Sequence, residues 1–284
     1  LASAVANTID VVALTNDLSF LRVFILHSGK DYLFVKDENV FLSKYLTDVS
    51  ADNSLFNSIL INYRKSTAET LNKDLRTRHC KVTGVSTIAQ FYEGEIVICE
   101  QGVKLGSSSS TKKNPELFTY CSYKITSVQS TSLYVNAYED PETNELLIYS
   151  TAKSPKTSSD MQSFEIPVYL LSAEDVSGIE FSNIYVLQDE QNIDYLYILN
   201  TLHKQAKYRG ESTYWEAYHG FKQQFVKFNY SYASHTHVVQ GTTYNNVYVN
   251  MKDIFSVKPT NLREKLQSLY TAITRARKKV VIYY

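Results

Sequence analysis

The sequence predicts an α/β fold in which a parallel-sheet domain is interrupted by a small antiparallel β domain. An apolar run of strand length, Ser58–Asn62, is followed at once by a segment with helical spacing, Thr67–Arg76. After Cys80 the pattern changes to several strand-like segments. Helical and strand patterns alternate again from about Asn183, so the first domain is expected to resume there.

The α/β pattern is expected in residues 1–80 and again in residues 181–284. In the first stretch, residues 1–22 have helical spacing and Tyr32–Val35 is a short strand candidate. In the second stretch, helices are predicted at Asp194–Lys207, Ser212–Val226 and Asn261–Ala276. Strands are predicted there at Ile184–Leu187, Phe228–Ala233, Asn246–Asn250 and Lys279–Tyr284.

Residues 81–180 are predicted to form the inserted β domain. Its strand candidates are Gly94–Glu100, Leu117–Gln129, Ser132–Tyr138 and Glu145–Ser150. The stretches between them are polar and rich in Ser, Lys and Pro: Gly106–Pro115, Pro141–Asn144 and Thr151–Asp160. Such stretches bury too little apolar surface to become ordered, so they are predicted to be mobile loops.

Composition limits the class of protein. The chain has 284 residues, a length typical of two domains, and 44% of them are apolar. No apolar run reaches the roughly 18 residues of a membrane span, and the first ten residues lack the basic and apolar regions of a signal peptide. They also lack an initiator Met. We therefore expect a fragment, a processed chain or a trimmed chain, intracellular and cytoplasmic, with no membrane partner.

Cysteine and histidine usage predicts neither disulfides nor a metal site. The three cysteines, Cys80, Cys99 and Cys121, are odd in number and have no CxxC spacing, which is typical of free thiols in a reducing compartment. His235 and His237 would share one face of a strand. No nearby Cys or carboxylate completes a set of metal ligands around them.

Charge is unevenly distributed along the chain. Residues 1–200 hold 16 Lys and Arg against 25 Asp and Glu, whereas residues 201–284 hold 13 against 4. A basic segment on an acidic chain indicates contact with a polyanion or a solvated face. The chain also has 23 Tyr and few Arg, a usage typical of AT-rich genomes such as those of many phages.

The most specific segment is Leu269–Arg277, with the sequence LYTAITRAR, which leads into the predicted strand KKVVIYY. Its apolar stripe predicts a helix packed on a sheet, and the helix end presents Thr274, Arg275 and Arg277. An Arg at such a position can bind a phosphate through its fixed fork of donors. A cation at a helix C-terminus can also simply stabilise the helix dipole.

The segment YTAITRAR, followed by a β-strand, resembles motif VI of superfamily 1 helicases. In that family the Arg after Thr is the arginine finger, which reaches the γ-phosphate of ATP across the cleft between two RecA-like domains. The resemblance implies this catalytic role for Arg275, with Thr274 at the nucleotide. Such an Arg stabilises the charge that develops during phosphoryl transfer.

A second segment is Tyr232–Val249, with the sequence YASHTHVVQGTTYNNVYV. It predicts a strand, a polar loop that contains Gly241, and another strand. A polar loop between sheet strands is a common place for a ligand site in α/β folds, although an ordinary surface turn has the same composition. The segment is similar to motif V of RecD-like and Dda-like helicases, YAxTxHKSQGSTYxNVxV.

The motif V resemblance implies contacts with the nucleotide or with single-stranded DNA for six residues. The nucleotide contacts are implied for Gln240 and Gly241, and the DNA contacts for His235, His237, Thr242 and Thr243. The sequence departs from the family where His235 replaces Thr and where Val238 and Val239 replace Lys and Ser. Loss of the Lys removes a phosphate contact, which puts the strength of DNA coupling in doubt.

A third segment, Ile59–Asn72, resembles motif IV, a strand followed by an Arg or Thr and by a helix with a Leu-Asn pair. The resemblance places Arg64 at the phosphate-sensing position and implies a second catalytic contact. An exposed Arg at the end of a strand is also common without any such role. The three segments occur in the family's order.

The sequence contains no phosphate-binding GxxxxGK[ST] segment. Ile184–Glu190 imitates the Asp-Glu box that holds Mg²⁺, but it follows motif IV, so we interpret it as a strand end with two solvated acids. The resemblance then implies the second RecA-like domain of a helicase, interrupted by an SH3-like insertion. A P-loop domain, in cis or in trans, would complete the ATP and Mg²⁺ site, and this chain alone would be inactive.

The expected function is therefore the C-terminal motor half of an ATP-dependent DNA helicase that moves along single-stranded DNA, in the 5′ to 3′ direction of its look-alikes. Two alternatives stay open. One is a non-catalytic nucleic-acid-binding or adaptor protein derived from a helicase half, which the replacements at Val238 and Val239 favour. The other is a structural subunit with no DNA contact.

Overall fold

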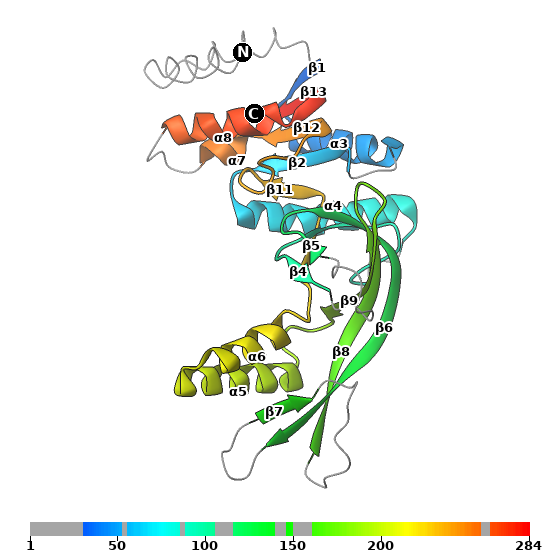
Figure 1. Ribbon diagram of the computed structural model, residues 1–284. Helices are drawn as coiled ribbons and strands as arrows, with labels where there is room; N and C mark the ends of the chain where they lie inside the picture. The colour runs from blue at the N-terminus through cyan, green and yellow to red at the C-terminus, as the bar shows by residue number, and fades with distance from the viewer. Residues whose placement is uncertain are drawn as a thin grey trace. The chain divides into compact units, whose positions relative to one another are not determined.

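The computed structural model describes residues 31–52, 56–85, 89–105, 116–139, 146–149, 161–256 and 262–284. Its contacts divide the chain into two compact units, the first of residues 1–88 and 230–284 and the second of residues 89–229 (Figure 1). The helix predicted in residues 1–22 and the three polar stretches predicted as loops lie outside the described residues. Within the described ranges, no helix is both long and apolar enough to cross a membrane.

The first unit contains a five-stranded sheet whose neighbouring strands pair in parallel. Its strands, in spatial order, are β1 (Asp31–Val35), β13 (Ala276–Tyr283), β12 (Tyr244–Asn250), β2 (Ser58–Asn62) and β11 (Ala233–His235). Val247 of β12 lies opposite both Ile59 and Val280, so β12 is paired on both sides. All five residues of β2 are buried, as expected for a parallel strand that is covered on both faces.

Helices cover both faces of this sheet (Figure 1). They are α3 (Glu38–Asp52), α4 (Lys65–Thr83), α7 (Met251–Ser256) and α8 (Leu262–Thr274). On one face, Leu269 and Ile273 of α8 pack into a core with alternate residues of β2, β12 and β13. On the other face, the ring of Phe41 on α3 lies 5.6 Å from Tyr248 and 5.4 Å from Tyr283. The α/β domain predicted from the sequence is therefore present.

Strand β11 lies at one edge of the sheet, and side chains of the neighbouring helices hold it there. Asn72 of α4 donates to the carbonyl of Ala233 at 2.8 Å and accepts from its N–H at 2.7 Å, so a buried amide replaces the missing neighbouring strand. The Tyr45 hydroxyl donates to the carbonyl of Tyr232 at 2.6 Å. His79, near the end of α4, lies 3.0 Å from the Tyr232 hydroxyl.

The second unit is built on an antiparallel sheet, as predicted. The path is β10 (Phe228–Tyr230), β3 (Ile96–Cys99), β6 (Ser122–Glu139), β8 (Met161–Glu174) and β9 (Glu180–Leu187), and β7 (Leu146–Tyr149) also pairs with β6. A small ribbon is formed by β4 (Val103–Lys104) and β5 (Glu116–Leu117). Strand β6 runs unbroken through two segments that the sequence predicts as separate strands.

Helices α5 (Ile193–Arg209) and α6 (Ser212–Lys222) also belong to the second unit. The sequence predicts both helices but assigns residues 181–229 to the α/β domain. In the structure, Ile198 and Phe221 pack with Ile166 and Val168 of β8, so the two helices bury their apolar faces against the antiparallel sheet. The predicted strand Phe228–Ala233 is likewise divided between the two sheets, as β10 and β11.

Replacing Asn72 with Ala is expected to destabilise the first unit by about 2–4 kcal/mol, because it leaves the buried N–H and carbonyl of Ala233 without partners. Urea-induced unfolding followed by circular dichroism measures the loss. The matched control is Lys73→Ala, the next residue of α4, whose side chain is exposed. Equal midpoints for both variants would show that the Asn72 amide does not hold the edge strand.

Candidate functional site

The segment Leu269–Arg277 forms the end of α8 and the start of β13, as the sequence predicts. Leu269, Ala272 and Ile273 are buried against the sheet, and Ala276 begins β13 as a buried residue. Arg275 lies between the helix and the strand, half-buried, and its N–H donates to the carbonyl of Ala272 at 3.2 Å. The short connection therefore fixes the backbone from which the Arg275 side chain extends.

The guanidinium of Arg275 is held only by neutral acceptors. Its Nε donates to the Thr271 carbonyl at 3.2 Å, Nη1 to the Thr242 carbonyl at 3.4 Å, and Nη2 to Thr274 Oγ1 at 3.1 Å. Among the described residues no carboxylate pairs with it. Because these contacts orient the group without neutralising it, its charge is available for an external anion such as a phosphate.

The motif V loop, residues 236–243, joins β11 to β12. Val239 anchors the loop because its side chain is buried in the α8 side of the core. Gly241 follows with a φ of 85°, a left-handed conformation that favours glycine. Gln240, Thr242 and Thr243 are exposed around this turn, so the polar side chains of the loop face outward.

Motifs V and VI contact each other directly. Besides the bond from Arg275 to Thr242, Arg277 Nε donates to Thr243 Oγ1 at 3.0 Å. The N–H of Tyr244, where β12 begins, donates to the carbonyl of Arg275 at 2.8 Å. The structure thus brings Arg275, Thr274 and the Gly241 turn together at the amino ends of β12 and β13, although 31 residues separate Thr243 from Thr274 in the sequence.

His235 and His237 lie at the other end of the loop, where β11 ends. Their rings are 6.1 Å apart, and His237 is exposed whereas His235 is partly buried. Burial lowers the pKa of His235, and the charges of His237 and Lys65 lower it further while Glu69 opposes them. In the part of the chain that the structure describes, no group of three or more His, Cys, Asp or Glu residues could hold a metal ion.

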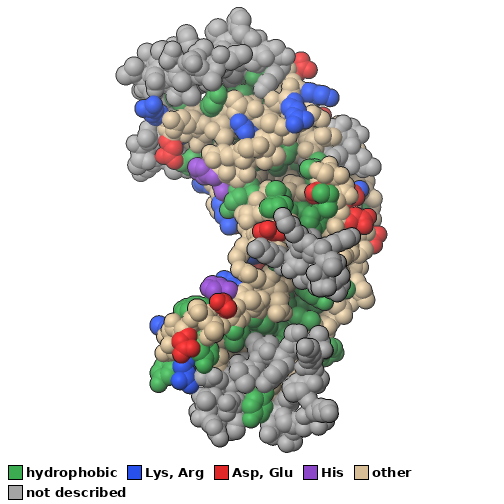
Figure 2. Space-filling model, viewed as in Figure 1, with side chains coloured by type: hydrophobic (Ala, Val, Ile, Leu, Met, Phe, Trp, Pro, Cys, Tyr) green, Lys and Arg blue, Asp and Glu red, His purple; other side chains and the backbone are tan. Residues whose placement is uncertain are grey.

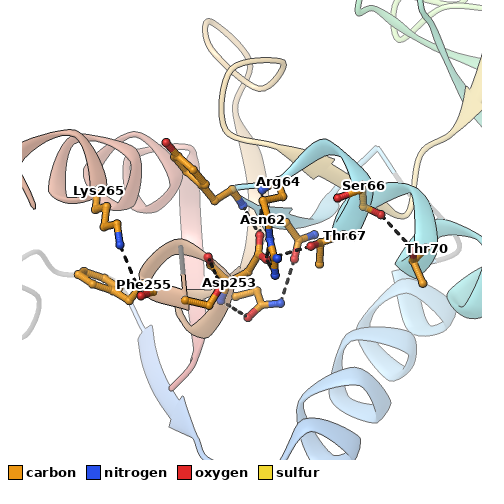
Figure 3. Close-up of polar contacts among 11 residues, drawn as sticks. Asn62, Arg64, Ser66, Thr67, Thr70, Asp253, Phe255 and Lys265 are labelled. Carbon is orange, nitrogen blue, oxygen red and sulfur yellow. Dashed lines mark hydrogen bonds and ion pairs between the residues drawn. The ribbon is translucent and has the colours of Figure 1, made fainter. Parts of the chain in front are cut away.

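Arg64 is held by the buried carboxylate of Asp253 (Figure 3). Asp253 of α7 has a side chain that is only 2% exposed, and its Oδ1 lies 2.6 Å from Arg64 Nη2. The same carboxylate accepts the N–H groups of Tyr63 and Arg64 at 2.9 Å each and the Thr67 hydroxyl at 2.9 Å. This arrangement fixes the first turn of α4 to α7.

Arg64 and Arg275 consequently lie at opposite ends of the parallel strands. Arg64 follows the carboxyl end of β2, whereas Arg275 precedes the amino end of β13. Strands rise about 3.3 Å per residue, so the seven residues of β12 separate the two ends by roughly 20 Å. The structure does not bring the two predicted catalytic arginines together, because strand direction places the residues before and after a strand at different edges.

The partner of Arg64, Asp253, is a residue that the sequence analysis missed. A signal for it existed, because Asp253 is the only acidic residue between Glu216 and Glu264, within the basic part of the chain. An isolated acid three residues after a buried strand is a candidate for a structural ion pair. Asn72 was quoted only as part of the motif IV resemblance, and its contact with β11 could not be seen without the strand order.

The two valines that depart from the motif V pattern have different surroundings. Val239 is 1% exposed and belongs to the core, so at this position the chain uses the side chain for packing. Val238 is partly buried and is not part of that core cluster. Only the replacement of Lys by Val238 therefore removes a group that would have been free to contact a phosphate.

Comparison with known proteins identifies the segment that carries both motifs. Residues 230–283 match the family model of the UvrD-like helicase C-terminal domain. The resemblance to superfamily 1 helicases is thereby confirmed. Motifs V and VI both lie inside the matched residues, and motif IV lies outside them. The RecD-like or Dda-like subtype stays a prediction.

Two individual proteins are similar to parts of the chain. An uncharacterized protein, R530, of Acanthamoeba polyphaga mimivirus is 37% identical over 70 residues, which are 24% of this chain and 14% of that protein. The crystal structure of Pif1 helicase from Candida albicans aligns with a TM-score of 0.27 and 12% identity over 87% of this chain and 54% of that chain. The chain thus spans only part of the length of either protein.

Replacing Asp253 with Asn is expected to cost about 1–3 kcal/mol at neutral pH, because the charged acceptor of four hydrogen-bond donors is lost. Burial alone would raise the pKa of Asp253, but hydrogen bonds from Arg64, Thr67 and Tyr63 outweigh it and hold the pKa below 3.8. The stabilisation is therefore present above pH 3.8 and is lost as the pH falls through the lower, folded-state pKa.

Urea unfolding of both proteins between pH 7 and pH 3 measures this difference. The gap between wild type and Asp253→Asn should be constant at neutral pH and narrow below about pH 4. Asp74→Asn, which breaks an exposed ion pair with Arg78, is the matched control and should cost under about 0.5 kcal/mol. A gap that does not depend on pH would contradict a depressed pKa.

Exchanging the two valines for the family residues is expected to have separate effects. Val238→Lys should strengthen the binding of single-stranded DNA. The slope of the logarithm of the binding constant against the logarithm of salt concentration should steepen by about 0.7, the contribution of one added phosphate contact.

Val239→Ser should leave that slope unchanged and lower the free energy of unfolding by about 1–3 kcal/mol, because it places a hydroxyl in the core. Fluorescence anisotropy of a labelled oligonucleotide at several salt concentrations and urea unfolding measure the two effects. A slope unaltered by Val238→Lys would show that the loop does not contact phosphate.

Proposed function

We propose that this chain is the C-terminal motor half of an ATP-dependent helicase, and that Arg275 is its arginine finger. The observation that carries the proposal is the set of hydrogen-bond partners of the Arg275 side chain. Arg275 is oriented by three neutral acceptors and has no carboxylate partner among the described residues, so it can stabilise an incoming γ-phosphate. The family match over residues 230–283, which include Arg275, supports the proposal.

In the proposed reaction, water attacks the γ-phosphorus and the bond from that phosphorus to the bridging oxygen of ADP breaks. Negative charge develops on the transferred phosphoryl group, and Arg275 would donate hydrogen bonds to its oxygens. Thr274, whose Oγ1 accepts from Arg275 Nη2, would fix the guanidinium while this happens. ATP would bind between this unit and a P-loop domain present in cis or in trans.

Mg²⁺ would be held by the P-loop domain. Among the residues that the structure describes, no group of three or more His, Cys, Asp or Glu could hold a metal ion. The chemistry that Mg²⁺ supplies is charge neutralisation on the β- and γ-phosphates. The contribution of this chain to the ATP site would be Arg275, with Gln240 and Gly241 beside it.

The contacts between motifs V and VI suggest how hydrolysis would be coupled to the nucleic acid. Movement of Arg275 toward a phosphate would break its bond to the Thr242 carbonyl and release one restraint on the loop. Thr242, Thr243, His235 and His237 would bind single-stranded DNA along this loop. Binding would be mainly to phosphates and by stacking, so it would be strongly salt-dependent and little dependent on sequence.

Finer features of the helicase are part of the same proposal. We propose that the protein is of the RecD-like or Dda-like subtype and moves along DNA from 5′ to 3′. In this proposal the first unit has a RecA-like fold, the second unit has an SH3-like fold, and the protein is intracellular. Arg64 is not included in the catalytic pair, because Asp253 holds it at the opposite edge of the sheet. Its contact with Asp253 supports a structural role instead.

A non-catalytic adaptor is the second candidate, and Val238 is the observation that favours it. The loop lacks the Lys of the family pattern at that position, and a decayed motor could retain strand binding without coupling it to ATP. Val239 does not add to this argument, because its side chain serves the core. The two candidates differ in one measurable property, ATP hydrolysis that depends on Arg275.

Arg275→Ala is expected to lower the single-strand-stimulated ATPase rate by on the order of 10³-fold in the protein that contains this chain together with its P-loop domain. ATP affinity should change little, because the finger acts mainly in the transition state. Arg78→Ala is the matched control, since Arg78 lies on α4 in an exposed pair with Asp74. Steady-state phosphate release measures both. Hydrolysis that survives Arg275→Ala would contradict the arginine finger, and strand binding without any hydrolysis in the unmutated protein would favour the adaptor.

A further inference from the structure

The second unit contains a pocket of about 360 Å³ that neither the ATP site nor motif V uses. Its walls come from the β9–α5 connection and the α6–β10 connection, together with residues beside β3. The apolar part of the lining includes Leu187, Phe225 and Phe228, all of them buried. A pocket of this size and composition is typical of a site for a small flat ligand.

Three amide side chains lie around this apolar lining. They are Gln90, Gln101 and Gln191, contributed by three different segments of the unit. A primary amide carries both a donor and an acceptor, the combination that pairs with the edge of a nucleobase. Unstacked bases of single strands are commonly bound in this way, with the ring against apolar or aromatic side chains and the edge against polar ones.

Two lysines line the same pocket, and only one of them is paired with carboxylates. Lys227 is neutralised, because its Nζ lies 3.0 Å from a Glu190 carboxylate oxygen and 3.8 Å from one of Glu100. Lys222, the last residue of α6, is exposed and forms no ion pair with any residue that the structure describes. The pocket therefore has one cation at its rim that is available for a phosphate.

Aromatic and histidine side chains lie on the same face of α6 as Lys222. Trp215, Tyr218, His219 and Lys222 follow the spacing i, i+3, i+4 and i+7, which places them on one face of the helix. The Trp215 and His219 rings are stacked at 5.9 Å, and His203 of α5 lies 5.8 Å from Trp215. Over α5 and α6, Figure 2 shows histidine and hydrophobic side chains beside charged ones on the surface.

The dimensions of this face suit a single strand. Seven residues separate Trp215 from Lys222, about 10 Å along the helix axis, which equals about three stacked nucleotides at 3.4 Å each. Trp215 and Tyr218 are half-buried and His203 and His219 are exposed, so the rings are fixed yet accessible. Aromatic rings beside an unpaired lysine are the usual elements of a surface that binds single strands without sequence preference.

We propose that the second unit carries its own site for single-stranded nucleic acid. One unstacked nucleotide places its base in the pocket, with its edge toward the Gln90, Gln101 and Gln191 amides, and its phosphate on Lys222. A base about three nucleotides along the strand stacks on Trp215. The inference does not depend on ATP hydrolysis or on motif V, because every residue in it belongs to the second unit.

The chain contains a single Trp, so tryptophan emission reports directly on this face. In the full chain, titration with a twelve-nucleotide oligothymidylate should quench the emission of Trp215, and the quenching should weaken with added salt. Arg275→Ala, in the other unit, should leave the quenching unchanged. Thymidine monophosphate, which shares the base and phosphate chemistry, should bind at least ten times more weakly than the oligonucleotide, because it lacks a second base to stack on Trp215.

Variants test the pocket itself, with anisotropy of a labelled oligonucleotide as a second readout. Lys222→Ala and Gln191→Ala should each weaken the quenching titration about 3- to 10-fold, whereas Lys204→Ala, an exposed lysine of α5 outside the pocket, should have no effect. Binding seen by anisotropy without quenching of Trp215 would overturn the inference and leave the proposed helicase function intact. Equal effects of Lys222→Ala and Lys204→Ala would overturn the pocket, and equal affinity for the mononucleotide would overturn the single strand as its ligand.

Discussion

The pairing of β12 with both β2 and β13 is the constraint on which the first unit depends. It places side by side three strands whose sequence positions are separated by up to about 200 residues, and Ile59, Val247 and Val280 on these strands are buried in one core. Because the strands are parallel, the residues that precede β12 and β13 meet at one edge. That edge holds the bonds from Arg275 to Thr242 and from Arg277 to Thr243.

The two arginines that the helicase resemblance singles out, Arg64 and Arg275, differ in whether a carboxylate compensates their charge. Both are partly exposed, and both hydrogen-bond to oxygen acceptors. Arg64 faces the nearly inaccessible carboxylate of Asp253, so its charge is compensated within the chain. Arg275 faces carbonyl and hydroxyl oxygens, which orient a cation without cancelling it. Only the second arrangement leaves a strong site for an external phosphate.

Local patterns in the sequence predicted individual helices and strands well, but they predicted poorly which of these pack against one another. The apolar run of β2 and the stripe of α8 were sufficient, since burial on a sheet imposes a short-range period. Strand β6 was predicted as two strands because Ser130 and Thr131 interrupt its apolar pattern. Helices α5 and α6 were predicted as helices but assigned to the other domain, because periodicity shows which face is apolar and not what covers it. The motif resemblance located Arg275, whereas the opposite placement of Arg64 required the strand directions.

The contact between His79 and Tyr232 has a consequence for how such a chain could evolve. His79 lies one turn before the end of α4, a few residues before the chain leaves the first unit after Ile88, and Tyr232 lies two residues after the chain returns at Tyr230. The points of exit and return are thus already joined by the α/β unit's own contacts, with Asn72 completing the join at Ala233. When the ends of an inserted domain are held together by contacts within the first unit, the insertion can change in length or be replaced without disrupting the parallel sheet of that unit. The second unit can therefore change in length and sequence without disturbing the packing that positions Arg275.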